Sequence, residues 1–397
     1  MENPQQLIRS WELQGSFSNG AVTQDKLVPR EFTRIRTPFI QTWRHEQMTA
    51  TLNWGSQYHS WYVPDSLRVI GSMFLRIELP AINSGNYKDI PGLYAVDQIR
   101  FLTNGTESYF VQVGQFLRDY LESLTDEQAD IYARTFLGYR GDGGTAAARV
   151  LMIPIMLPNS PYFLRSGRDT QGHGVWPAYL GGAKLEVQFT LPAAGACVKA
   201  GADDPASIST NISVCIHQVE MTTEDVAGYS DSRGQYSVMT RRFTELTDGW
   251  TNLAANTRGK ITQKQPVGNV TELFAIAVPQ GTVDVSKEIQ SNVKATHFSI
   301  TSDSVVQKSL NTPEKVEMEL WQNGFIGNKF ANSPSRLCFS AHASEAENLY
   351  SGAYNMYNSS QITIDLEFAE NVDYRLFAVQ LQRIIINGAG DVIASLT

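Results

Sequence analysis

The stretch Lys184-Leu185-Glu186-Val187-Gln188-Phe189-Thr190-Leu191 alternates strictly between polar and apolar residues. About 175 residues further along the chain, Gln361-Ile362-Thr363-Ile364-Asp365-Leu366-Glu367-Phe368 alternates in the same way. A period of two places every apolar side chain on one face of a half-buried β-strand. Both stretches are therefore predicted to be strands of sheets that cover a core on one side only.

The surroundings of the two stretches also repeat. Each is preceded by an apolar strand and a turn rich in Gly, Tyr and Pro. Each is followed by one more long apolar strand, Ile212–Met221 in the first half and Val372–Ile386 in the second. The sequence therefore predicts two copies of one β-fold in a single chain.

Length and composition allow this arrangement. The chain has 397 residues, enough for two domains that each bury a core, and its 42% hydrophobic and 18% charged residues are typical of a folded globular protein. The net charge of −8 argues against a dedicated nucleic-acid binder, which needs an excess of Lys and Arg. The local basic group of Arg30, Arg34, Arg36 and Arg44 is interrupted by Glu31 and Glu46, as ordinary surface or interface charges are.

Cys197, Cys215 and Cys338 are too few and too scattered for a disulfide framework or a paired metal site, so we expect reduced thiols. The first residues lack the basic start and apolar run of a signal peptide. No apolar stretch approaches the roughly 20 residues that a membrane-spanning helix requires.

Residues 1–36 are predicted to form an N-terminal arm. Gln5–Leu13 has the spacing of a short amphipathic helix, with Leu7 and Trp11 among its apolar residues, and Gly15–Gly20 ends it. Such an arm either tethers a neighbouring subunit, touches a membrane surface, or packs on its own domain. The sequence leaves these alternatives open.

The first domain is predicted over residues 37–224 and the second over 225–397, because the composition turns polar around Thr222–Gly234. Strands are expected at Leu67–Leu79, Leu93–Leu102, Val150–Leu157, 259–266, 271–278, 295–306 and 336–342. A helical insert near 107–137 interrupts the first domain, with Thr125 and Gln128 as a capping box. A shorter insert near 312–323 interrupts the second, with Thr312 as N-cap and Gly324 as its end.

Motifs for catalysis are missing from the sequence. The six histidines include no HxH pair and no HExxH, which excludes the metal site of a two-domain cupin enzyme. The run Gly138–Thr145 lacks the GK[ST] ending of a P-loop and follows a helix instead of opening one. No GxSxG nucleophile elbow is present. We expect no enzyme activity, no catalytic residues, no metal and no cofactor.

Aromatic residues are dense in one region, which holds Trp43, Trp54, Trp61 and Tyr62. In a sandwich protein such residues stack on sugar rings or fill the core and subunit interfaces. Asp365 and Glu367 have the residue type of glycosidase carboxylates, but they alternate on the polar face of a regular strand, where solvated charges normally lie. We favour core or interface roles for the aromatic group.

The last predicted strand is apolar on both faces. Even-numbered positions, which share one face of a strand, include Tyr374, Leu376 and Ile384. Odd-numbered positions, on the other face, include Phe377, Val379, Leu381 and Ile385. A strand with two apolar faces is covered on both sides. We expect it to contact its own core on one side and the other domain or a neighbouring subunit on the other.

These features resemble the double jelly-roll major capsid proteins of tailless icosahedral DNA viruses. The similarity is best at the C-terminal end, where Leu337–Ala343, the Ser351–Asn355 turn and Ile362–Phe368 match the family's order of strand, Ser-Gly turn and alternating strand. In the first half, Val150–Leu157 and Trp176–Leu191 are similar to the family's proline-rich strand and the following turn. The resemblance covers most of residues 40–395.

The resemblance implies an all-β fold of two consecutive jelly-roll sandwiches with short helical inserts. It implies a homotrimer shaped as a near-hexagonal block, which tiles the shell of a virion assembled inside the host cell. The partners it implies are neighbouring trimers, penton and minor or cement capsid proteins, and an internal membrane in some members. It implies no sequence-specific contact with nucleic acid.

Two other functions remain as alternatives. One is a carbohydrate-binding or carbohydrate-active double sandwich, which would act as a monomer on a glycan. The other is a trimeric tail or spike protein that binds a receptor and forms fibres or knobs instead of flat blocks.

Overall fold

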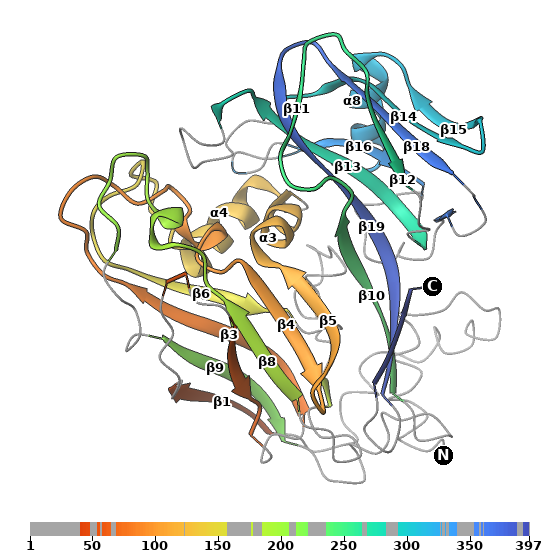
Figure 1. Ribbon diagram of the computed structural model, residues 1–397. Coiled ribbons are helices and arrows are strands. Elements are labelled where there is room, and N and C mark those ends of the chain that lie inside the picture. The colour runs from red at the N-terminus through yellow and green to blue at the C-terminus, as the bar shows by residue number, and fades with distance from the viewer. Residues whose placement is uncertain are drawn as a thin grey trace.

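A computed structural model describes residues 40–47, 54–55, 58–64, 69–122, 124–156, 176–177, 185–205, 212–220, 236–263, 268–282, 293–325, 327, 330, 333–339, 353–356, 359, 361–386 and 392–396. Over these residues the chain forms two β-sandwiches, each built from two antiparallel sheets (Figure 1). The N-terminal arm, with Leu7 and Trp11, lies outside the described residues, as does the predicted domain boundary at 224/225.

The first sandwich pairs a five-stranded sheet with a four-stranded sheet. The first sheet has the order β1 (Ile40–Gln47), β9 (Ile212–Glu220), β3 (Val69–Leu79) and β6 (Arg149–Ile155), with β7 (Trp176–Pro177) beside β3. The facing sheet has the order β2 (His59–Tyr62), β8 (Leu185–Thr190), β4 (Gln98–Thr103) and β5 (Thr106–Gln112). Short 3₁₀ turns lie at Pro91–Leu93 and Ala194–Cys197.

The second sandwich repeats this strand order. One sheet runs β10 (Tyr236–Glu245), β19 (Val372–Ile386), β13 (Asn269–Pro279) and β16 (Ser335–Cys338), and the other runs β12 (Gly259–Gln263), β18 (Ile362–Phe368), β14 (Ala295–Ser302) and β15 (Val305–Leu310). The short strands β11 (Thr251–Leu253) and β20 (Val392–Leu396) pair with β19, and β17 (Tyr354–Asn355) pairs with β13. In both sandwiches the first strand therefore lies beside the last long strand, as in a jelly roll.

Helices occupy the same place in both halves. α3 (Val113–Glu122) and α4 (Asp126–Phe136) lie between β5 and β6, and α8 (Pro313–Gln322) lies between β15 and β16. The capping box of Thr125 and Gln128 is confirmed, and so is Thr312 as the N-cap of α8. Gly324 follows the end of α8 with a φ of 77°, which a glycine adopts readily.

The strand registers show how closely the two sandwiches repeat. Trp43 of β1 lies opposite His217, and Phe243 of β10 lies opposite Val379. The central pair β3–β9 has a bulge between Ile70 and Ser72, and β13–β19 has one between Val270 and Glu272. Positions in the early strands thus correspond at an offset of 200 residues. A bulge kept at the same place marks a shared backbone design.

The hairpin between the fourth and fifth strands repeats in the same detail. Its turn is Asn104-Gly105 in the first sandwich and Asp303-Ser304 in the second, and all four residues have positive φ. Positive φ at both central residues defines the type I′ turn that fits the twist of a two-residue hairpin. A bulge then follows at Ser108 and at Gln307, respectively.

The repeated alternating strand of the sequence is confirmed. It forms β8 and β18, in which Val187 lies opposite Phe101 and Ile364 lies opposite Ile300. In β18, buried and half-buried residues alternate without exception. The apolar face of each strand enters the core of its own sandwich.

Three predicted elements need correction. Residues 107–112, placed in the first helical insert, belong to strand β5, because they pair with β4 and bury Tyr109 and Val111 on one face of the sheet. The single strand predicted over 295–306 is two strands, since the Asp303-Ser304 turn reverses the chain. The strand predicted from Leu93 begins at Gln98, after the 3₁₀ turn at Pro91–Leu93.

Candidate functional site: the seam between the sandwiches

The two sandwiches meet along one face of the second sandwich, which we call the seam. β19 serves two cores: Leu376 and Ala378 belong to the core of the second sandwich, whereas Phe377 and Val379 join the core cluster of the first. Phe243 and Phe274, from the neighbouring strands, point to the same side as Phe377. The sheet of β10, β19, β13 and β16 therefore has no solvent-facing side at this point.

Aromatic rings fill the centre of the seam. The rings of Phe274 and Phe377 are stacked at 5.1 Å, and Phe243 meets Phe274 edge-on at 5.9 Å. Phe116 of α3 completes the group from the first sandwich, edge-on to Phe243 at 5.3 Å. Stacked and edge-to-face pairs at such distances stabilise beyond the area they bury. The seam thus has the packing of a core, not of a loose domain contact.

The seam continues toward β5. The guanidinium of Arg242 lies 4.8 Å from the ring of Phe110, so a side chain of β10 covers an aromatic ring of β5. Figure 1 shows β10 and β19 extending from the second sandwich past β5 of the first. Contacts along this length resist a rotation of one sandwich against the other.

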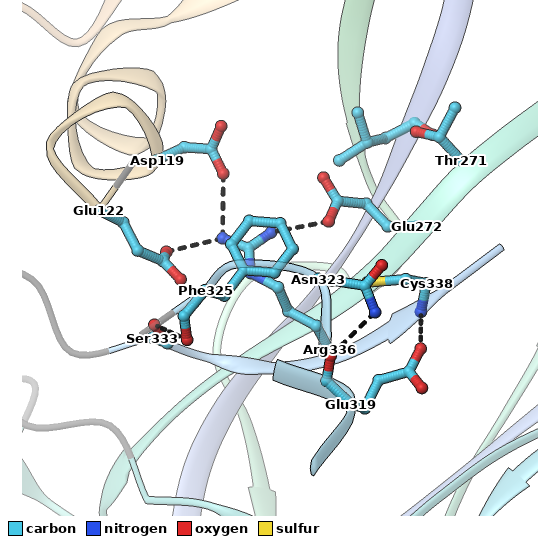
Figure 2. Close-up of polar contacts among 11 residues, drawn as sticks. Asp119, Glu122, Thr271, Glu272, Glu319, Asn323, Phe325, Ser333, Arg336 and Cys338 are labelled. Atoms are coloured by element: carbon cyan, nitrogen blue, oxygen red, sulfur yellow. Dashed lines mark hydrogen bonds and ion pairs between the residues drawn. The ribbon is translucent and has the colours of Figure 1, made fainter. Parts of the chain in front are cut away.

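A buried charge cluster lies at the opposite end of the seam (Figure 2). Arg336 of β16 donates through Nη2 to Asp119 at 2.9 Å and to Glu122 at 2.7 Å, both on α3 of the first sandwich. Its Nη1 donates to Glu272 of β13 at 3.0 Å. The Arg336 side chain is fully buried, and the three carboxylates are nearly so. We call these four residues the Arg336 cluster.

The electrostatics of α3 explain why the cluster is needed. Asp119 and Glu122 lie in the last turn of the helix, where the partial negative charge of the helix end disfavours acids, and α3 has no basic residue there. Arg336 supplies the missing cation from the other sandwich. Burial alone would lower the pKa of Arg336, but Glu122, Glu272 and Asp119 outweigh burial and hold its pKa well above the ordinary value.

The groups around the cluster hold Arg336 in place. The guanidinium lies 4.1 Å from the ring of Phe325 (Figure 2) and 4.9 Å from that of Phe274, so two aromatic rings contact it. Ser333 donates to the carbonyl of Phe325 at 3.1 Å and fixes that loop. Glu319 of α8 accepts from the backbone N–H of Cys338 at 2.9 Å and fixes β16. Each guanidinium contact thus comes from an anchored element.

The chemistry available at the seam is structural. The described residues contain no group of three or more His, Cys, Asp or Glu side chains arranged to hold a metal ion. No helix within the described parts of the chain is long and apolar enough to cross a membrane. A buried arginine with three carboxylates and a stacked aromatic group can fix an orientation between two bodies.

The residues singled out in the sequence fall into several places. Trp61 is buried in the first core, and Trp54 packs partly buried against it. Trp43 and Tyr62 are 63% and 60% exposed and lie on strands of different sheets, so the aromatic residues do not form one cluster. In β19, Phe377 and Val379 are buried at the seam and Ile385 is half-buried, whereas the side chain of Leu381 lies outside the described set.

Sequence reasoning missed the Arg336 cluster. Two signals were available: an arginine inside the apolar strand Ser335–Cys338, and a glutamate inside the apolar strand Asn269–Pro279. Charges at such positions require buried partners. Nothing in the sequence identifies those partners, because Asp119 and Glu122 lie more than 200 residues away, at separations of 217 and 214.

Comparison with known proteins places the fold. No protein-family model matches the chain, and no curated protein matches its sequence. Among solved structures, the PBCV-1 virus capsid aligns with a TM-score of 0.66 at 12% identity, over 91% of this chain and 98% of the other. The Faustovirus major capsid protein aligns with a TM-score of 0.62 at 9% sequence identity, over 95% of this chain and 97% of the other. The mavirus major capsid protein aligns with 0.56 at 9%, over 90% of each.

These alignments span both sandwiches and the seam between them. The chain therefore has the double jelly-roll fold of these capsid proteins, and the predicted fold class is confirmed.

Proposed function

We propose that this chain is the major capsid protein of an icosahedral DNA virus. Three copies would form a near-hexagonal block in which six similar sandwiches surround a threefold axis, and such blocks would tile the virion shell. The observation that carries the proposal is the repeat itself. Two sandwiches share strand order, bulges and hairpin turn, and a core-like seam joins them into one rigid unit.

Physical reasoning supports the same assignment. A shell built from flat hexagonal tiles needs a unit whose two halves are alike in shape and fixed in angle. The repeated fold makes the two halves alike in shape. The Arg336 cluster and the aromatic rings of the seam would fix the angle between them. A net charge of −8 suits contacts with other protein or a lipid layer better than a coat directly on the genome.

The partners of the proposed capsid protein are first other copies of itself, then neighbouring trimers. Penton and minor or cement proteins would complete the shell, and an internal membrane is a further candidate. Its place would be the virion, after synthesis in the host cell, and its role would be structural and not enzymatic.

Sedimentation and microscopy of the purified protein test the proposal. We expect a stable species of about three times 44.1 kDa and near-hexagonal blocks in negative stain. A strict monomer that binds or cleaves a glycan would instead establish the carbohydrate function. Trimeric fibres or knobs would establish a receptor-binding tail protein.

A further inference from the structure

The repeat shows that the first sandwich has its own version of the seam face. By register, Trp43 corresponds to Phe243, Phe74 to Phe274, Cys215 to Phe377 and Pro154 to Arg336. In the second sandwich this face is covered by the first. In the first sandwich it is partly covered by α4, whose Phe136 stacks on Phe74 at 5.4 Å, while Trp43 stays 63% exposed. We call this the Trp43 face; it also carries Val150, 47% exposed.

The second sandwich has its own version of the surface that fills the seam. The first sandwich fills the seam with β5 and α3, and the corresponding elements of the second are β15 and α8. α8 turns Val316 and Leu320 inward, which leaves Met318 and Trp321, three residues apart, on its outer side at 57% and 72% exposure. Val306 of β15 is 60% exposed and lies opposite Thr301 on the outer face of its sheet, whereas the adjacent Val305 points to the other face. We call Met318, Trp321 and Val306 the Trp321 ridge.

More than half of the exposed large apolar side chains belong to these two surfaces. The described residues leave nine such side chains exposed, and five of them belong to the Trp43 face or the Trp321 ridge. The other four are Tyr58, Tyr62, Ile131 and Val305. Exposed apolar groups that cluster mark interaction sites, and Trp is enriched among the residues that dominate binding.

We propose that the Trp321 ridge of one copy docks on the Trp43 face of a second copy, so that the seam is repeated between chains. Within one chain the two surfaces cannot meet, because β1 and β15 lie at opposite ends of the molecule (Figure 1). Two different surfaces make a head-to-tail contact, which closes into a ring when the rotation per step allows it. The inference rests on the proposed capsid function and names the residues that would join its subunits.

The proposed contact differs from the seam in one respect. Pro154 stands where the seam has Arg336, so the contact between chains has no counterpart to the buried arginine. We expect aromatic and aliphatic packing to dominate it. Removing one indole should therefore weaken assembly without disturbing the fold of the subunit.

Single substitutions on the two surfaces test the inference. Trp43→Ser and Trp321→Ser should each raise the concentration for half-maximal assembly at least tenfold in sedimentation velocity, while the melting temperature of the unassembled subunit falls by no more than about 4 °C. Tyr62→Ser is the matched control, because Tyr62 is 60% exposed but lies on β2, in the other sheet of the first sandwich. It should assemble as the wild-type chain does.

A photo-crosslinker identifies the contact directly. With p-benzoylphenylalanine at position 321 and an isotope-labelled second copy, we expect cross-links to peptides of β1 and β6 from the other chain. A wild-type trimer that both Trp variants leave intact, with cross-links elsewhere, would overturn this inference and leave the capsid function standing. A monomeric wild-type chain would overturn both, and cross-links to phosphatidylcholine vesicles would assign the ridge to lipid instead.

Discussion

The outer faces of the two sandwiches share one backbone and differ in what covers them. On the second sandwich, Phe243 is sealed beneath the first sandwich, and on the first, its counterpart Trp43 is 63% exposed. The difference shows that a duplicated fold need not use both copies of a face alike. One copy becomes internal structure, and we propose that the other meets a second chain.

The largest effect should come from breaking the Arg336 cluster. Arg336→Met leaves three buried carboxylates without their cation, and we expect it to lower the free energy of unfolding by about 3–5 kcal/mol. Urea denaturation measures the change. The control is Arg258→Met, which removes a 58% exposed arginine paired with Glu367 and should cost about 1 kcal/mol or less.

A neutral version of the cluster separates stability from orientation. When Arg336→Met is combined with Asp119→Asn, Glu122→Gln and Glu272→Gln, no unpaired charge remains, and much of the lost stability should return. If the cluster sets the angle between the sandwiches, small-angle scattering will still show a broader distribution of shapes. An unchanged scattering profile would mean that the aromatic seam alone sets the angle.

The second effect compares equivalent aromatic residues directly. Phe243→Ala removes a buried ring that contacts Phe116 and Phe274, so we expect a loss of about 3–5 kcal/mol. Trp43→Ala at the corresponding position should cost the unassembled subunit about 1 kcal/mol or less. Equal losses at the two positions would show that the exposure of Trp43 does not reduce its contribution to the stability of the subunit.

The third effect concerns the repeated hairpin. Gly105 has a φ of 78° with open space around it, whereas Ser304 holds a φ of 68° at the corresponding turn position. Because a serine is disfavoured in this region, Gly105→Ser should destabilise the chain by about 0.5–1 kcal/mol and Ser304→Gly should stabilise it by a similar amount. Changes of the same sign in thermal unfolding would contradict the equivalence of the turns.

The smallest expected effect is a pH dependence of stability that comes from His297 in the second sandwich. His297 occupies the strand position that Gln98 has in the first sandwich, and burial, aided by Arg258, lowers its pKa below 6.5 against the opposing effect of Asp365 and Glu367. Because the unfolded chain binds the proton more readily, stability is full above pH 6.5 and falls as the pH drops toward the lower folded pKa. Unfolding midpoints measured from pH 7.5 to 5 should show this loss, and His297→Gln should reduce it.

Periodicity carried the prediction of the fold a long way. The alternation at 184–191 and 361–368 located β8 and β18, and the two apolar faces of Val372–Ile386 anticipated a strand between two cores. It failed where two patterns overlap: residues 107–112 fit a helical spacing and a strand equally, and pairing with β4 decided the outcome. The offset of 200 residues emerged only from strand registers, because few of the equivalent residues are identical.

The site was harder to predict than the fold, for a physical reason. Local patterns report which side of an element is buried, but not what lies on the other side of the contact. Arg336, Asp119 and Glu122 interact only because two sandwiches meet at one angle. The sequence shows only that aromatic residues are dense near the start of the first sandwich. The register with the second sandwich is needed to see that Trp43 occupies the position of the seam residue Phe243, whereas Trp61 is buried in the first core.

The separation of 214 residues between Glu122 and Arg336 has a consequence for the order of events during synthesis. The carboxylates of α3 leave the ribosome long before the arginine that neutralises them, and ordering so long a loop is slow. Until β16 emerges, the end of α3 must remain hydrated, and the first sandwich cannot yet hold its final partner. We expect a nascent chain to acquire its rigid two-part shape late, which would delay subunit association until synthesis is nearly complete.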